Sequence, residues 1–171
     1  MQNNMQRGKH GVDHMAAAIK RVLFVCTGNT CRSPMAAALL RQQAAKAGLA
    51  LEVESAGVNA LTGAPASAGA IAAMKRYHID LRPHLAKRLT DITPHYDLIL
   101  TMSRTHRNQV INHLPMLAER VHVLREYVGV SGDSDVADPY GGCDAVYETC
   151  AGELAKLIQL LILSLKQENS S

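Results

Sequence analysis

The sequence predicts an α/β fold: a single three-layer domain with a four-stranded parallel sheet flanked by helices. Two observations indicate this class. Short apolar runs, typical of strands buried on both faces, alternate along the chain with segments of helical period, and the 171 residues are the size of one ordinary domain. Strands that alternate with helices imply right-handed crossovers, and these place the strands parallel in one sheet.

The first half of the chain contains two predicted strands and two predicted helices. Residues 22–25 are continuously apolar and predict a buried strand, and residues 51–55 alternate as a more exposed strand does. Between them, Ser33 as N-cap and Pro34 at the first helical position predict a helix that closes at Gly48. The alanine-rich segment 65–77 has helical spacing and predicts a second helix.

The second half repeats the alternation. Strands are predicted at 98–102 and 121–124, with a polar helix over 104–113 between them. A long loop, 129–142, leads into a last helix. Apolar side chains recur there at three- and four-residue steps and predict one core-facing stripe of Val146, Cys150, Leu154, Leu157, Ile158 and Leu161.

The two ends of the chain carry no predicted part of the fold. Residues 1–19 are polar and lack a sustained period, so we expect a disordered extension before a domain at 20–166 and a tail at 167–171. The extension lacks the apolar core of a secretory signal, and no stretch of the chain is long and apolar enough to span a membrane. We therefore expect a cytoplasmic protein with reduced thiols and no membrane partner.

Charge and histidine content exclude other classes. The formal net charge is only +3, part of it lies in the first twenty residues, and no nucleic-acid-binding motif accompanies it. The eight histidines show no metal-binding pattern. We expect no nucleic-acid partner, no metal and no cofactor.

The most informative segment is VCTGNTCRSP, residues 25–34, which follows the first strand. Five residues separate Cys26 from Arg32, enough for the backbone N–H groups of the loop to converge on one point. Gly28 and Asn29 tolerate the unusual dihedral angles of such a curl. The start of the next helix adds N–H groups and its positive dipole end. This predicts a cradle for a tetrahedral phosphate, with Arg32 binding two of its oxygens.

The same surroundings make Cys26 a candidate nucleophile. A thiol that faces a helix N-terminus and a guanidinium is favoured as the thiolate at neutral pH, and a hydroxyl such as that of Ser33 would stabilise it further. Attack on a bound phosphate would give a cysteinyl-phosphate, which water then hydrolyses.

This reaction needs a general acid, and the best candidate is Asp138, in the segment VADPYGG. It lies on the long loop after the last strand and so can reach the same edge of the sheet. An Asp-Pro turn without chemistry is the alternative. Asp133 and Asp135 are competitors, although nothing beside them in the sequence fixes their positions.

The loop and the later Asp-Pro segment resemble the low-molecular-weight protein-tyrosine phosphatase family, a likeness that runs from about residue 21 to 165 and includes ESAG at 54–57 and the segment 84–90. The resemblance implies that Cys26 is the nucleophile, Arg32 the phosphate clamp and Asp138 the general acid. It further implies a phosphate cradle at Thr27, Gly28, Asn29, Thr30 and Cys31, a supporting network of Asn29, Ser33 and Ser55, and a reversible protective disulfide between Cys26 and Cys31.

The substrate is expected to be a phosphorylated protein, with inorganic phosphate as product. Tyrosine-specific members usually carry a bulky aliphatic residue where this chain has Thr30, and threonine there is similar to a bacterial subgroup of protein-arginine phosphatases. Threonine in the pocket wall loses apolar packing against a phenyl ring and adds a hydroxyl that can orient a planar guanidinium. Phosphoarginine is therefore the predicted substrate. Tyr140 favours the alternative, phosphotyrosine, because an aromatic side chain beside the acid would flank a phenyl ring, although it would equally line the stem of a phosphoarginine.

Two other functions remain as alternatives. Thioredoxin-coupled arsenate reductases share the Cys-x5-Arg loop, but they need a pair of shuttle cysteines in mid-chain, and none occurs between Cys31 and Cys143. A non-catalytic anion-binding module would be expected to lack the nucleophile or the acid, and this chain has candidates for both.

Overall fold

The computed structural model describes residues 17–171, and its centre is a sheet of four parallel strands. The strands are β1 (Arg21–Cys26), β2 (Glu52–Gly57), β3 (Leu98–Thr101) and β4 (Val121–Val123), in the spatial order β2-β1-β3-β4. The predicted α/β class and the four-stranded parallel sheet are confirmed. The predicted disordered extension, residues 1–19, lies for the most part outside the described residues.

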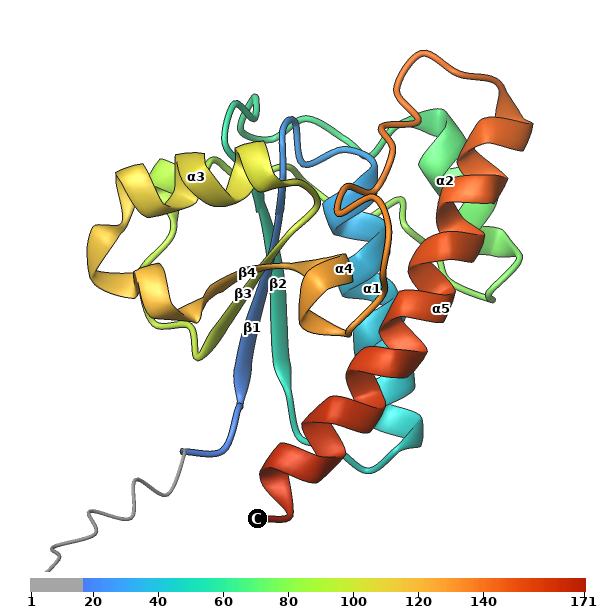
Figure 1. The fold of residues 1–171 in the computed structure, drawn as a ribbon. Coiled ribbons are helices and arrows are strands. Elements are labelled where there is room, and N and C mark those ends of the chain that lie inside the picture. Colours follow the sequence, from blue (N-terminus) through green and yellow to red (C-terminus); the bar gives the residue numbers. More distant parts are fainter. Residues whose placement is uncertain (1–16) are drawn as a thin grey trace, which may run out of the picture.

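Helices cover both faces of this sheet (Figure 1). On one face lie α1 (Arg32–Lys46) and the long α5 (Asp144–Asn169), with α2 (Ala68–Lys75) packed against α5. On the other face lies α3 (Arg104–His113). A short α4 (Leu124–Tyr127) follows β4, and short 3-10 helices span Leu89–Asp91 and Pro115–Arg120. The result is the expected three-layer arrangement.

The central strand β1 supplies side chains to both layers of the core. Val22 and Phe24 face the side of α1 and α5, whereas Leu23 and Val25 face the side of α3; none of the four is exposed. This alternation follows from the two-residue period of a strand. Because both faces are buried, β1 is apolar from Val22 to its carboxyl end at Cys26, and only Arg21 at its start is exposed.

Two helix starts differ from their predictions. Helix α1 begins at Arg32 after Cys31, with no side-chain cap, because the Ser33 hydroxyl bonds to groups of the preceding loop. The predicted N-cap at Ser33 is therefore wrong. Helix α2 is shorter than the predicted 65–77: Ser67 is its N-cap and accepts a hydrogen bond from the Ala70 N–H at 3.3 Å.

Helix α5 has the predicted apolar stripe, with one exception. Val146 is 43% exposed, and the neighbouring Tyr147 is buried instead, so the stripe is shifted by one residue at its start. The helix continues to Asn169, so the predicted boundary after residue 166 falls inside it. The Asn169 side chain accepts a hydrogen bond from the Ile19 N–H, which ties this end of the helix to the segment before β1. Within residues 17–171 no helix has the length and hydropathy that crossing a membrane requires.

Candidate active site

The loop between β1 and α1 forms one wall of a cavity of about 370 Å³ at the carboxyl edge of the sheet. Ligands of open parallel sheets bind at this edge. Nearly all of the residues predicted to hold a phosphate line the cavity, together with the acid candidate. The lining comprises Cys26, Thr27, Gly28, Thr30, Cys31, Arg32, Asn59, Asp138 and Tyr140.

Asn29, in the middle of the loop, turns its side chain into the protein and fixes the curvature of the loop. Its φ angle is +56°, in the left-handed region that asparagine tolerates better than most residues. Its side chain is fully buried and donates to Ser33 Oγ and to Ser55 Oγ, both at 2.8 Å. These contacts form the supporting network that the resemblance implied, and they place Ser55 behind the loop rather than in the cavity.

Two groups from the segment after α2 complete the environment of Asn29. The Lys87 N–H donates to Asn29 Oδ1 at 2.9 Å, and His84 Nε2 lies 2.7 Å from the Asn29 carbonyl oxygen, where it donates. Burial is the main cause that lowers the pKa of His84. Sequence reasoning did not single out either residue, although both belong to the segment 84–90 that carried part of the resemblance.

Gly57, the last residue of β2, allows the loop to approach the sheet. A Cβ atom there would lie 2.5 Å from the Thr27 carbonyl oxygen and 2.9 Å from the Asn29 nitrogen. Both are backbone atoms that no side-chain rotation can move. Glycine is therefore required at this position by close packing of two backbones.

Cys26 has a hydroxyl directed at its sulfur. Ser33 Oγ lies 2.9 Å from Cys26 Sγ, and the same oxygen accepts a hydrogen bond from Asn29 Nδ2. The hydroxyl proton can therefore be donated to the sulfur, and the other acceptor within reach, the Ala56 carbonyl oxygen, lies at the limiting distance of 3.5 Å. The sulfur thus lies beside a hydroxyl that can donate to it and close to the N-terminus of α1.

Arg32 links the loop to the segment that carries Asp138. The buried guanidinium donates from Nη1 to the Val136 carbonyl oxygen at 3.0 Å, and its Nη2 lies 3.4 Å from Asp138 Oδ2. Val136 is itself anchored by its N–H, which donates to the Met102 carbonyl oxygen beyond the end of β3. The half-exposed Asp138 carboxylate is thus held at the mouth of the cavity.

The competing carboxylates, Asp133 and Asp135, do not line the cavity. Asp135 accepts a hydrogen bond from the Arg104 N–H at the start of α3, and Asp133 accepts one from the Asp135 N–H. Both are therefore engaged in loop structure. Of the three candidate acids, the geometry brings only Asp138 to the thiol and the guanidinium.

His106 of α3 contacts the loop from the other side of the sheet edge. Its Nε2 lies 2.8 Å from Thr27 Oγ1, and its buried Nδ1 has no hydrogen-bond partner among residues 17–171. Burial first, and then the nearby charge of Arg32, lowers the pKa of His106 to about 4. The imidazole is therefore neutral at pH 7. No motif in the sequence pointed to this residue.

All four cysteines are free thiols in this structure. Cys31 Sγ lies 3.2 Å from Ser67 Oγ and 3.5 Å from the Tyr147 hydroxyl, so it faces α2 and α5. The Cys26–Cys31 disulfide stays a prediction. Cys150 is buried, as expected for a core residue, whereas Cys143 is exposed at the start of α5.

No cluster of three or more potential metal ligands occurs among residues 17–171.

Comparisons with known proteins agree with this geometry. The family model for low molecular weight phosphotyrosine protein phosphatase matches residues 21–171. A protein-arginine-phosphatase of Bacillus subtilis is 38% identical over 148 residues, which cover 86% of this chain and 97% of the relative. The tyrosine phosphatase PtpB of Staphylococcus haemolyticus is 33% identical and covers 81% and 94%.

Solved structures show the same fold. One is the YwlE arginine phosphatase as a cysteine-to-serine mutant with a phosphorylated active-site serine. It superposes with a TM-score of 0.81 at 37% identity and covers 85% of this chain and 95% of that chain. With a family model matching nearly its whole length and relatives of this similarity, the chain belongs to the low-molecular-weight family of cysteine-based protein phosphatases.

Proposed function

We propose that this protein removes the phosphoryl group from phosphoarginine in proteins through a cysteinyl-phosphate on Cys26. The observation that carries the proposal is the convergence of Cys26, Arg32 and Asp138 on one cavity beside a loop of backbone N–H groups. The related structure with a phosphorylated active-site serine supports a covalent intermediate at the equivalent position.

In the first step, the thiolate attacks the phosphorus and the bond from phosphorus to the leaving nitrogen breaks. Arg32 and the loop N–H groups bind the phosphoryl oxygens, where they stabilise the charge that develops. Asp138, as the general acid, gives its proton to the leaving nitrogen, so that the substrate's guanidinium departs as the guanidinium of arginine and Asp138 is left as the carboxylate.

In the second step, water replaces the sulfur on phosphorus. The carboxylate of Asp138 accepts a proton from the attacking water, and the phosphorus–sulfur bond breaks to release inorganic phosphate and the Cys26 thiolate. The Ser33 hydroxyl bond to the sulfur stabilises this leaving thiolate. The two steps use only water and the groups of this chain.

The preference for arginine rests on the polarity of the cavity wall. Thr30 and Asn59 both line it next to Asp138. A guanidinium is planar and carries several N–H donors, for which hydroxyl, amide and carboxylate oxygens are matching acceptors. A phenyl ring at the same place would leave these polar groups without partners, which has a free-energy cost.

Phosphotyrosine is the second candidate substrate, and Tyr140 is the observation that favours it. This side chain lines the same cavity and is 77% exposed, so it can move against a substrate ring. Aromatic pairs contribute about 1 kcal/mol beyond the apolar area they bury.

A comparison of kcat/KM on matched phosphoarginine and phosphotyrosine peptides tests the preference. We expect the unmodified protein to favour phosphoarginine, and Thr30→Ile to shift the ratio toward phosphotyrosine by about tenfold, the effect of roughly one hydrogen bond. A preference for phosphotyrosine that Thr30→Ile leaves unchanged would overturn the substrate assignment.

The nucleophile is tested separately with Cys26→Ser. We expect turnover to be abolished while inorganic phosphate still binds, because the loop N–H groups and Arg32 remain. Residual turnover close to that of the unmodified protein would contradict the mechanism. A catalytic thiolate works where thiols stay reduced, which supports the cytoplasm as the compartment of this activity.

A further inference from the structure

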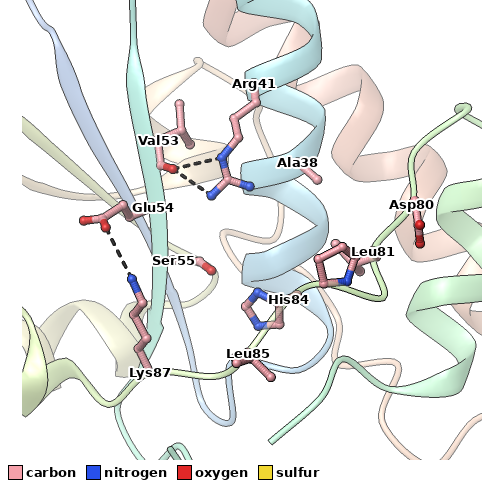
Figure 2. A pocket seen from close by; sticks show the side chains of 11 residues that line it. Ala38, Arg41, Val53, Glu54, Ser55, Asp80, Leu81, His84, Leu85 and Lys87 are labelled. Carbon is pink, nitrogen blue, oxygen red and sulfur yellow. Dashed lines mark hydrogen bonds and ion pairs between the residues drawn. The ribbon is translucent and has the colours of Figure 1, made fainter. Parts of the chain in front are cut away.

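A second cavity, of about 470 Å³, lies behind the phosphate loop (Figure 2). Its walls come from α1, from β2 and from the segment 80–87. The volume is in the range of small-molecule sites, roughly 300 to 1,000 Å³. The lining comprises Ala38, Arg41, Val53, Glu54, Ser55, Asp80, Leu81, Pro83, His84, Leu85 and Lys87. Nothing in the proposed reaction uses this space.

The acidic side chains of this cavity already have partners. Glu54 accepts a hydrogen bond from the Tyr96 hydroxyl and lies 3.4 Å from Lys87 Nζ. Both carboxylate oxygens of Asp80 are occupied by the Arg82 side chain. These carboxylates are therefore poor sites for a cationic ligand.

Arg41, by contrast, lacks a carboxylate partner. Its guanidinium takes part in none of the ion pairs found within residues 17–171, and it donates from Nε and Nη2 to the Val53 carbonyl oxygen at 3.0 and 2.7 Å. The dashed lines of Figure 2 show this contact. Arg41 is exposed overall, yet the partial burial of its guanidinium lowers its pKa, and the charge of Glu54 opposes that shift.

Three basic side chains, Arg41, His84 and Lys87, line the cavity, and Lys87 is already paired with Glu54. After burial, the charged groups that lower the pKa of His84 are Arg41 and Lys87. An anion at this place would interact favourably with Arg41 and His84, and would share Lys87 with Glu54. The remaining lining is apolar: Ala38, Leu81, Pro83 and the 60%-exposed Leu85.

We propose that this cavity binds a small organic anion, a carboxylate or phosphate head on an apolar body, and that its occupation tightens phosphate binding at the loop. The head lies among Arg41, His84 and Lys87, and the apolar body lies against Leu81 and Leu85. The binding part is independent of the proposed function, whereas the coupling part rests on it.

The coupling follows from shared contacts with Asn29. Ser55, His84 and Lys87 all line the cavity, and each of them bonds directly to Asn29. An anion beside His84 favours its protonated form, and a charged imidazole donates a stronger hydrogen bond to the Asn29 carbonyl oxygen. The bound anion thereby stabilises the left-handed backbone that shapes the loop.

Binding is tested by titrating benzoate into the full chain at saturating inorganic phosphate, with methyl and imidazole NMR signals as the readout. We expect shifts at Leu81, Leu85 and His84, and binding at least fivefold weaker in Arg41→Gln. Lys46→Gln is the matched control, because Lys46 lies on the same helix outside the cavity, and its affinity should equal that of the unmodified protein.

Two results would overturn the binding site. One is equal affinity for benzamide, the neutral analogue, which would show that charge is not recognised. The other is a set of shifts confined to the methyl signals of Thr27 and Thr30, which would place benzoate at the phosphate loop instead. Unchanged affinity in Arg41→Gln would also contradict the proposal.

Coupling is tested by measuring the dissociation constant of inorganic phosphate with and without saturating benzoate. We expect benzoate to tighten phosphate binding about fivefold, and phosphate to tighten benzoate binding by the same factor, because coupling is reciprocal. A factor of one with benzoate bound in the cavity would overturn the coupling. Failure of the proposed function is seen separately, as turnover that survives Cys26→Ser.

Discussion

The Ser33 hydroxyl lies 2.9 Å from the Cys26 sulfur and, through its oxygen, accepts a hydrogen bond from Asn29. The sequence favoured Ser33 as a helix N-cap, which would direct its side chain to the helix backbone. Its position one residue inside α1 instead frees the hydroxyl for the thiol. One serine thus connects the nucleophile candidate to the residue that shapes the loop.

Ser33→Ala removes this donor and should slow both turnover and thiol alkylation. A hydrogen bond to a charged group contributes about 1.5–3 kcal/mol, so we expect a decrease of at least tenfold in kcat and in the iodoacetamide rate at pH 7. Ser164→Ala, which removes a helix-surface hydroxyl on α5, is the control and should change neither rate. Equal alkylation rates in both variants would contradict a Ser33–thiolate bond.

Gly57→Ala tests the close approach of β2 to the phosphate loop. The added Cβ meets two backbone atoms, at 2.5 and 2.9 Å, so the loop must move. Overpacking of this kind costs about 1–3 kcal/mol of stability, and we expect weaker phosphate binding in the folded protein as well. The measurements are urea denaturation and phosphate titration.

The matched control for Gly57 is Gly152→Ala in α5. A Cβ atom at Gly152 meets only the Tyr77 hydroxyl, at an ordinary contact distance of 3.9 Å. Alanine has the higher helix propensity, so this variant should gain about 1 kcal/mol. Equal effects of the two substitutions would show that the tight contact at Gly57 has no consequence.

Asp138→Asn tests the general acid. The amide cannot supply a proton, so kcat on protein-derived substrates should fall about 10²- to 10⁴-fold. An aryl phosphate with a good leaving group should lose much less, since its departure needs no proton. Asp135→Asn is the control, because Asp135 accepts a hydrogen bond from the Arg104 N–H and lies away from the cavity lining. A uniform loss on both substrate types would argue for a structural function of Asp138.

The main parts of the site could be predicted because each has a strong local pattern. The apolar run of β1 and the Cys-x5-Arg spacing placed Cys26 and Arg32 at the carboxyl edge of the sheet. The Asp-Pro segment on the long loop placed Asp138 at the same edge. Their juxtaposition across 112 residues of chain follows from topology, because the carboxyl ends of parallel strands share an edge.

What the sequence did not reveal depends on long-range contacts without a local signature. Helix α1 starts earlier than predicted, at Arg32, and Ser33 bonds to Cys26 and Asn29 rather than capping the helix backbone. Tyr147 replaces Val146 in the core because its ring packs against Gly69 of α2, an approach that only the folded chain shows. His106 lies 79 residues from its partner Thr27 and has no motif around it.

His106 gives a prediction for stability against pH. Its pKa is lowered to about 4 in the folded protein, mainly by burial, whereas an unfolded histidine titrates near 6.5. Between these two values the unfolded state binds more protons, so the free energy of unfolding falls as the pH falls from about 6.5 to 4. One such group contributes a slope of up to about 1.4 kcal/mol per pH unit.

His106→Asn removes the titrating group and should flatten the pH dependence by up to that slope, although the loss of the Thr27 contact lowers stability at every pH. Urea denaturation from pH 4.5 to 7 measures the two slopes. Other titrating groups, including His84, are present in both proteins, so the difference isolates His106. His113→Asn, an exposed position on the same helix, serves as the control and should follow the unmodified protein. Parallel curves for His106→Asn and the unmodified protein would mean that this imidazole is not held neutral by the fold.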